Sequence, residues 1–291
     1  MILYIEFLFF RILIMTEAFK FIHSAENTFF KKLKKLTLSN KNRQVEKRVL
    51  LEGEHLFESY CDTGRIPEAI IFQEEHIPYD YLSAIKKRFA LQLKNTAFFV
   101  LPKNLFMQLS QLESLPSCLT LAVLPESQNI SIFQESLVLL DNIQDPGNMG
   151  TILRTVRAAG IKQIILSKGC VDLWSPKVLR AGMGAHFDLN SHTVHSLLEF
   201  VSALRKESQF SIFATALDHT AQSLYDYHFD MRHPVGFIFG NEGKGISPDL
   251  LGASTKLLYI PMDQSPAVES LNVAQSVAIT LFEYRRQCLY R

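Results

Sequence analysis

Short apolar runs alternate with amphipathic segments throughout the first half of the chain. Runs of period about 3.6 are typical of helices, and short apolar runs bounded by turn residues are typical of buried strands. The pattern predicts, in order, a helix at 25–36, a polar loop at 37–47, a short strand and a helix from Glu54 to near Gly64, a strand at 67–73, a helix at 79–89, a strand at 97–102, a helix at 103–112 and a strand at 117–125. These elements amount to a small α/β domain.

The second half alternates in the same way. It predicts strands at 136–141, 162–167, 210–217, 235–240 and 256–261, and helices at 149–159, 176–182, about 195–206 and from Glu269 onward. Apolar strands separated by helices are typical of a mostly parallel sheet with helices on both faces. The polar stretch "PESQNISIFQE" separates the halves, so we expect a 25–125 domain, a 126–135 linker and a 136–291 domain.

We expect the first 24 residues, which begin "MILYIEFLFFRILIM", to be an N-terminal extension. This apolar run is shorter than the roughly 20 residues that cross a bilayer, and Glu6 and Arg11 interrupt it. It lacks a basic n-region and a cleavage site. We expect no membrane association, with Met15 as the physiological start; a weak interfacial anchor is the alternative.

Composition describes a globular chain: 291 residues, 47% hydrophobic, 20% charged, with a net charge of +1. The charge is unevenly spread, because eight basic residues and one acid lie between Lys31 and Arg48. Such a run can bind phosphate backbones or can be a solvated helix face. The candidates for RNA contact are Lys31, Lys32, Lys34, Lys35 and Arg43.

The four cysteines are far apart and form no C-x-x-C pair. This spacing fits a reducing, cytoplasmic compartment and indicates neither a disulfide framework nor a zinc site. His192 and His195 are three residues apart but have no third ligand nearby. We therefore expect no metal.

Polar residues gather where predicted strands end, which is where open parallel sheets bind ligands. After the first strand of the second half come Asp141, Asn142, Asp145, Asn148, Arg154 and Arg157. After the strand at 235–240 comes "GNEGKG", which matches neither the P-loop pattern nor G-x-G-x-x-G. After the strand at 256–261 comes a loop that leads to "ESLNV" and a long helix.

Taken together, these three motifs resemble the SpoU family of RNA 2′-O-ribose methyltransferases, part of the knotted SPOUT superfamily. They are D-N-x-x-D-P-x-N-x-G-x-x-x-R-T, F-G-N-E-G-x-G and I-P-M followed by E-S-L-N-V. The segment 166–185 is also similar to the family, and "VLLEGEHLFES" and "IPEAIIFQEE" resemble its accessory substrate-binding domain. Two differences stand out: "DQSPAV" is longer than the usual glycine-containing loop, and Gly182 stands where the family tends to have serine.

The resemblance implies a C-terminal α/β domain with a trefoil knot, and an N-terminal domain similar to a ribosomal-protein fold. It also implies a cytoplasmic homodimer in which the final helix packs between subunits. The expected cofactor is S-adenosyl-L-methionine (SAM), and the expected partner is RNA, most simply ribosomal RNA. The implied cofactor-binding residues are Gly240, Ile260, Met262 and Leu271, largely through backbone atoms.

The implied catalytic residues are Asn148, Arg154, Glu242, Ser270 and Asn272, and Lys177 and Arg180 add RNA contacts. A guanidinium stays protonated in proteins, so we expect Arg154 to bind a phosphate and stabilise a developing alkoxide rather than to act as a base. Asn148 is either a helix N-cap or a ribose ligand, or both.

Three alternatives remain at this point. The substrate is transfer RNA, the protein is a catalytically silent RNA binder, or it is a nucleotide-dependent oxidoreductase. The first two share the motifs above, and the failed glycine fingerprint argues against the third.

Overall fold

The computed structural model describes residues 19–112, 114–125, 135–207, 210–263 and 270–290. The chain divides into two units, Met1–Pro125 with Trp174–Pro176, and Glu126–Leu173 with Lys177–Arg291. Residues 1–18, most of the expected linker and the loop at 264–269 lie outside the described residues. In the described part of the chain, no helix is long and apolar enough to cross a membrane.

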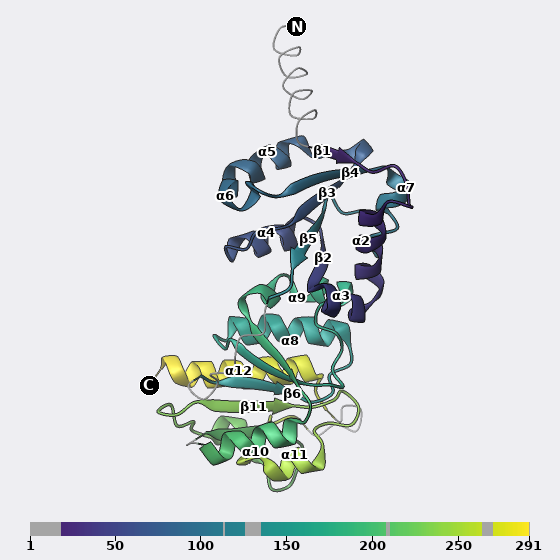
Figure 1. The fold of residues 1–291 in the computed structure, drawn as a ribbon. Helices are drawn as coiled ribbons and strands as arrows, with labels where there is room; N and C mark the ends of the chain where they lie inside the picture. The colour runs from purple at the N-terminus through teal and green to yellow at the C-terminus, as the bar shows by residue number, and fades with distance from the viewer. Residues whose placement is uncertain (1–18, 113, 126–134, 208–209, 264–269, 291) are drawn as a thin grey trace. The chain divides into compact units, whose positions relative to one another are not determined.

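Unit 1 is a five-stranded mixed sheet, ordered β1-β4-β3-β5-β2, with helices on both faces (Figure 1). Its elements are β1 (Phe19–Phe21), α2 (Thr28–Leu38), α3 (Asn40–Glu46), β2 (Arg48–Glu52), α4 (Glu54–Asp62), β3 (Ala69–Gln73), a 3₁₀ turn (Glu74–His76), α5 (Tyr79–Arg88), α6 (Ala90–Leu93), β4 (Ala97–Leu101), α7 (Lys103–Phe106) and β5 (Leu119–Val123). One core joins α2 and α7 to the sheet, and the other joins α4 and α5 to it.

Three expectations for unit 1 were wrong. Residues 19–21 were expected in the N-terminal extension, but they form β1 and pair with β4 in the sheet. The expected loop at 37–47 contains helix α3, which is capped by the Ser39 hydroxyl and ends at Lys47 in a left-handed conformation (φ 53°). The residue that this helix buries is Arg43 rather than an apolar side chain. The sequence therefore shows no apolar periodicity that would predict the helix. The helix expected at 103–112 is only one turn, α7.

Unit 2 is a seven-stranded sheet, ordered β10-β12-β9-β11-β6-β7-β8, and every neighbouring pair in it is parallel. Its elements are β6 (Leu137–Leu140), α8 (Pro146–Ala158), β7 (Gln163–Ser167), α9 (Pro176–Gly182), η3 (Ala185–Asp188), β8 (Asn190–Val194), α10 (Leu197–Glu207), β9 (Ser211–Thr215), β10 (Gln222–Ser223), η4 (Leu224–Asp226), β11 (Val235–Phe239), α11 (Pro248–Ala253), β12 (Lys256–Tyr259) and α12 (Val273–Leu289). The expected α/β class with a mostly parallel sheet is confirmed.

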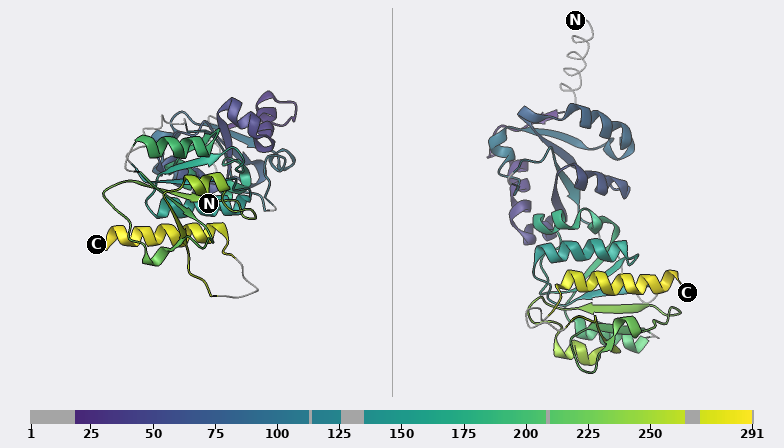
Figure 2. Two further views of the ribbon diagram at one scale, coloured as in Figure 1. Left: turned by 90° about the horizontal axis from the view of Figure 1, so that it is seen from below. Right: turned by 180° about the vertical axis from the view of Figure 1, so that it is seen from behind.

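Helices cover both faces of the unit 2 sheet. Helices α8 and α12 lie side by side on one face, and α10 and α11 lie on the other (Figures 1 and 2). The central strands β6 and β11 are continuous apolar runs and are buried at every position. Burial on both faces explains why these strands lack polar alternation.

The sheet order places three distant segments at one edge. Strand β11 lies between β6 and β9, and β12 lies between β9 and β10. After β6 the chain adds β7 and β8 on one side of the sheet, and the later strands on the other side. In doubly wound sheets, a crevice opens at the carboxyl ends of the strands where the order reverses in this way, which here is between β6 and β11. The loops that follow β6, β9, β11 and β12 all leave from this edge.

Candidate active site

The turn after β6 is built by its own aspartates. Asp145 Oδ1 accepts the backbone N–H of Asn148 at 2.7 Å and caps α8, with Pro146 in the first turn. The helix therefore begins at Pro146 rather than at the expected residue 149, and Asp145, not Asn148, is the N-cap. Because the cap is supplied by another residue, the Asn148 side chain is available for other contacts.

Glu242 joins the turn after β11 to the turn after β6. Its Oε2 accepts the N–H of Gln144 at 3.3 Å, and its Oε1 accepts the N–H of Asp145 at 3.1 Å and Asn148 Nδ2 at 3.2 Å. Burial raises the pKa of Glu242, but hydrogen bonds from its own backbone, from Asn148 and from the backbones of Asp145 and Gln144 outweigh burial and hold the pKa below its ordinary value. Glu242 is therefore an ionised anchor at neutral pH.

Asn272 adds the third loop to this network. Its Nδ2 donates to Asn148 Oδ1 at 2.9 Å, while its Oδ1 accepts the N–H of Ala274 at 2.8 Å and caps α12. Glu242 can only accept, so the amide of Asn148 must turn its nitrogen to Glu242 and its oxygen to Asn272. Three residues from distant motifs thus fix one another's orientation.

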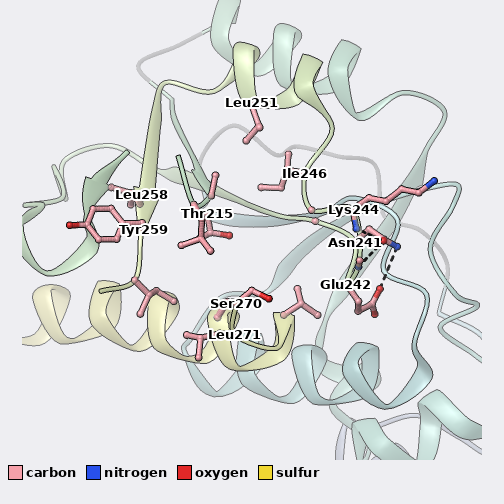
Figure 3. A pocket seen from close by; sticks show the side chains of 18 of the residues that line it. Thr215, Asn241, Glu242, Lys244, Ile246, Leu251, Leu258, Tyr259, Ser270 and Leu271 are labelled. Atoms are coloured by element: carbon pink, nitrogen blue, oxygen red, sulfur yellow. Dashed lines mark hydrogen bonds between the residues drawn. The ribbon is translucent and has the colours of Figure 1, made fainter. Parts of the chain in front are cut away.

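A cavity of about 390 Å³ opens beside this network, among the loops that follow β9, β11 and β12 (Figure 3). All four expected cofactor residues line it, and so do Glu242 and Ser270. Its walls are mostly apolar, and its hydroxyl groups come from Thr215, Ser270 and Ser276 among others. A volume of a few hundred Å³ with few polar groups is typical of a small-molecule site.

Gly240 owes its place to the loop that it begins. A Cβ at this position would lie 2.3 Å from the carbonyl carbon of Gly245. Asn241 and Gly245 exchange backbone hydrogen bonds at 3.0 and 2.9 Å, which close the loop on itself. The loop's own backbone therefore requires glycine here.

Several lining residues were missed by sequence reasoning: Thr215, Ala216, Leu217, Asn241, Ile246, Leu251, Leu258, Tyr259, Val273 and Ser276. Thr215 ends β9, Ala216 and Leu217 directly follow it, and Tyr259 ends β12. Their position at the carboxyl ends of strands was the available signal. Their side chains, small or apolar for the most part, gave no chemical one.

Arg154 lies outside the network just described. It is exposed on α8, and no hydrogen bond or ion pair holds it within the described residues. Arg157, three residues later, forms an ion pair with Asp188 of η3. The two arginines of this helix therefore differ: Arg157 is engaged within the fold and Arg154 is available to a ligand.

Gly182 illustrates how the fold accommodates a departure from the family pattern. A Cβ on Gly182 would lie 2.3 Å from Cε1 of His186, which is only 4% exposed. Burial lowers the pKa of His186 to about 4, although a backbone hydrogen bond at Leu173 opposes that shift. A neutral imidazole thus occupies the space that a serine side chain at 182 would need.

The candidate RNA contacts are placed unevenly. Lys31 pairs with Glu26, Lys32 Nζ lies 3.0 Å from Glu46, and Lys34 Nζ donates to Gln108 at 2.7 Å. Lys35 and Lys177 are exposed, and Arg180 is half-buried.

Arg43 does not belong with the surface lysines. It is 4% exposed and its guanidinium donates to the carbonyl of Leu36. Its role is to close the end of α2, so the prediction that it contacts RNA was wrong. A basic residue in a dense basic run can still be an interior residue.

All four cysteines are free thiols. Within the described residues, no group of three His, Cys, Asp or Glu side chains is placed to hold a metal ion. The polar side chains that line the cavity are hydroxyls, the amide of Asn241, the carboxylate of Glu242 and the ammonium group of Lys244.

The SpoU rRNA Methylase family matches residues 135–282. The chain is 30% identical over 267 residues to the Bacillus subtilis 23S rRNA (guanosine(2553)-2′-O)-methyltransferase RlmP, covering 91% of this chain and 99% of the relative. It is also 30% identical to the human mitochondrial rRNA methyltransferase 3, covering 84% and 69% of the two chains. The SpoU methyltransferase AviRb from Streptomyces viridochromogenes, solved with AdoMet, has the same fold, with a TM-score of 0.77, 23% identity and coverage of 91% and 99%. The chain belongs to the SpoU rRNA methylase family.

Proposed function

We propose that this protein transfers the methyl group of SAM to the ribose 2′-hydroxyl of a ribosomal RNA nucleotide. The observation that carries the proposal is the network of Asn148, Glu242 and Asn272 beside the cavity. RlmP, which matches over nearly its whole length, is named for this reaction on 23S rRNA.

The cavity fits the cofactor in size and in chemistry. Ile260 and Leu271 offer apolar surface to an adenosyl group, and the loop at Gly240 offers backbone donors and acceptors without a side chain. Half-buried Met262 adds a further apolar side chain to the lining. When bound, SAM supplies a methyl group on a positively charged sulfur, which needs no further activation for displacement.

The chain's own residues position the hydroxyl that is methylated. Asn148 and Asn272 are held in fixed orientations through Glu242, which lines the cavity together with the hydroxyl of Ser270. Holding two reactants in line removes much of the entropic cost of a bimolecular reaction. Arg154, exposed on α8, binds a phosphate of the target nucleotide and stabilises negative charge that develops on the ribose oxygen.

Glu242 is a positioning residue rather than a general base. A lowered pKa makes its carboxylate a weak base, and four N–H donors already occupy its oxygens. Its role is to keep the turns after β6 and β11 together and to set the amide of Asn148.

RNA is also contacted by exposed and half-buried cations outside the cavity. Lys31, Lys32, Lys34 and Lys35 on α2, and Lys177 and Arg180 on α9, are the candidates. The first three must give up internal partners to bind phosphate, which limits their contribution.

The active form is a cytoplasmic homodimer whose unit 2 contains a trefoil knot. Helix α12 buries Ala274, Val277, Thr280 and Leu281 within the chain, yet Phe282 is 48% exposed and Leu289 is 60% exposed. An apolar second face on this helix supports an interface between two copies. Size-exclusion chromatography with light scattering checks this, with Phe282→Asp expected to shift the mass toward the monomer.

The experiment that tests the function is transfer of labelled methyl groups from SAM to deproteinised total RNA from cells that lack this protein. Label in one rRNA species, at a linkage that resists alkali, is the expected result for 2′-O-methylation. Asn272→Ala is run beside the wild type, because it breaks the contact with Asn148 while leaving most of the cavity intact. It is expected to abolish most of the transfer.

The alternatives have distinct outcomes in the same experiment. Label in transfer RNA alone would move the substrate to that class. SAM binding without transfer to any RNA, including assembly intermediates of the ribosome, would contradict the proposed activity. Failure to bind SAM would indicate a silent RNA binder.

A further inference from the structure

Lys168 stands at the tip of a tightly held turn after β7. The N–H of Cys170 donates to the carbonyl of Ser167 at 3.2 Å, and the N–H of Val171 donates to the carbonyl of Ile143 at 2.8 Å. The backbone on both sides of Lys168 is therefore fixed. Its side chain is exposed.

Lys244 stands at the tip of a second such turn, after β11. Asn241 Oδ1 accepts the N–H groups of Gly243 and Lys244, each at 3.0 Å, and the backbones of Asn241 and Gly245 close the turn. Although Lys244 belongs to the cavity wall, its side chain extends away from Ser270 and Leu271 (Figure 3). Its ammonium group is presented to solvent.

The two turns are joined through Asn142 of the turn between them. Asn241 Nδ2 donates to the carbonyl of Asn142 at 2.8 Å, and the N–H of Asn142 donates to Ser167 Oγ at 2.9 Å. Gly169 packs against the Asn142 side chain so closely that a Cβ would lie 1.6 Å from its Oδ1. Three loops that leave neighbouring strands thus form one hydrogen-bonded unit.

The acids of this edge do not neutralise the lysines. Glu242 and Asp145 accept backbone and amide N–H groups, and buried Asp141 accepts Asn142 Nδ2 at 2.8 Å and the N–H of Ser247 at 3.1 Å. Within the described residues, neither Lys168 nor Lys244 has a side-chain hydrogen bond or an ion pair. Two cations are therefore carried on rigid turns without a partner in the part of the chain that the structure describes.

We propose that Lys168 and Lys244 bind phosphates of the RNA strand on either side of the nucleotide that is methylated. The inference rests on the proposed function and adds two binding residues to it. Strands β7 and β11 are separated only by β6, so the two turns leave the sheet about 10 Å apart. That separation suits two different phosphates of one short backbone segment. The fixed turns leave only side-chain entropy to be lost on binding.

The test compares Lys168→Ala, Lys244→Ala and the double variant with Lys162→Ala. Lys162 is exposed just before β7, at the opposite end of the strand that Lys168 follows, and so serves as the matched control. The probe is deproteinised rRNA from cells that lack this protein, with binding measured across a range of salt concentrations. SAM binding and methyl transfer are measured on the same preparations.

Loss of each phosphate contact lowers the slope of log affinity against log salt by about 0.7 to 0.9. We expect this change for each single variant, about twice the change for the double variant, and none for Lys162→Ala. The KM for rRNA rises while SAM affinity stays within twofold of wild type. Arginine at either position restores the slope.

Three outcomes would overturn the inference: slopes equal to that of wild type, an equal loss in Lys162→Ala, or weakened SAM binding in Lys244→Ala with unchanged rRNA binding. The last would assign Lys244 to an anionic group of the cofactor. The wild-type protein separates this test from that of the proposed function. If it methylates no rRNA, the function fails, and if it does so while the variants match it, only the inference fails.

Discussion

The basic helices of unit 1 and the loop edge of unit 2, meaning the loops that follow β6, β7 and β11 with the adjoining helix α8, differ in how many of their cations are available to a ligand. Helices α2 and α3 lie in the densest basic run of the chain, yet three of their lysines have internal partners and Arg43 is buried. At the loop edge, basic residues are scattered along the sequence. Arg154, Lys168 and Lys244 are nevertheless exposed and without internal partners among the described residues.

The difference follows from how each region is built. On adjoining short helices, charged side chains a few residues apart reach one another and their neighbours. At this edge of the parallel sheet, the carboxylates of the loops accept hydrogen bonds from backbone N–H groups. The cations of the same loops therefore have no ion pair with these acids. The availability of a charge is thus set by the fold around it rather than by the local density of basic residues.

Arg154→Ala is the substitution expected to break the loop edge most severely. Removing a charge that stabilises a developing oxyanion costs about 10²- to 10³-fold in kcat. SAM affinity should hardly change, because Arg154 is not among the cavity-lining residues. Single-turnover methylation and calorimetric SAM binding check both points. Arg154→Lys keeps the positive charge but loses the bidentate geometry of the guanidinium, so it should recover part of the rate. Activity of Arg154→Ala within fivefold of wild type would show that Arg154 has no role in the mechanism.

Acid sensitivity of unit 2 is the next largest effect, and it arises from His186. Its folded pKa of about 4 lies below the unfolded value, so the unfolded state binds more protons between the two. Stability should therefore fall as pH drops from about 6.5 toward 4, by about 1.4 kcal/mol per pH unit.

Thermal unfolding of wild type and His186→Leu across this pH range measures the effect. The variant should show a flatter dependence, whereas His219→Ala should match wild type because that side chain is 92% exposed. Parallel curves for wild type and His186→Leu would show that His186 titrates normally.

The sequence predicted the unit 2 strands well because they are buried on both faces and read as continuous apolar runs. It did not predict β8, whose residues Asn190–Val194 are mostly polar and lie at the edge of the sheet. An edge strand pairs with one neighbouring strand, and in β8 the buried position is His192. Such a strand shows no apolar run in the sequence.

The site residues were predictable where a polar motif follows a strand. The contacts between side chains of different loops were harder to predict. Asn148, Glu242 and Asn272 were chosen from motifs, and a contact between Glu242 and Asn148 or the arginine was expected. Which of the two Glu242 contacts, and through which atoms, depends on the packing of loops about a hundred residues apart. The exclusion of a serine at 182 by His186 depends on side-chain packing that spacing alone does not reveal.

Glu242→Gln sharpens the description of the loop edge as a network of fixed orientations. Glutamine keeps the shape but directs an amide N–H₂ at one of the N–H donors, so Asn148 loses its defined orientation. We expect a loss of about tenfold in kcat, typical of a small misplacement of reacting groups. SAM affinity and rRNA affinity should stay close to wild type.

The pH profile separates positioning from a general loss of structure. The Glu242 pKa lies below its ordinary value of 4.5, so the contribution of the carboxylate is present above that value and is lost as pH falls through the folded pKa. The activity of wild type should therefore fall at acid pH as Glu242 becomes protonated. The activity of Glu242→Gln should not show this fall, because glutamine does not titrate. An unchanged acid limb in the variant would contradict the positioning role.

Replacing Lys31, Lys32 and Lys34 together by alanine is expected to have the smallest effect of all. Each lysine must exchange an existing partner for phosphate, so its net gain on binding RNA is small, in line with the 0 to 1 kcal/mol of exposed ion pairs. The affinity of the triple variant for rRNA should fall by less than about threefold at moderate salt, which is below the loss in the double variant of Lys168 and Lys244 although one more charge is removed. Titrations of the two variants against the same rRNA preparation make the comparison directly. A tenfold or larger loss in the α2 variant would show that the internal pairs open freely when RNA approaches, and the contrast between the two regions would then be one of static structure only.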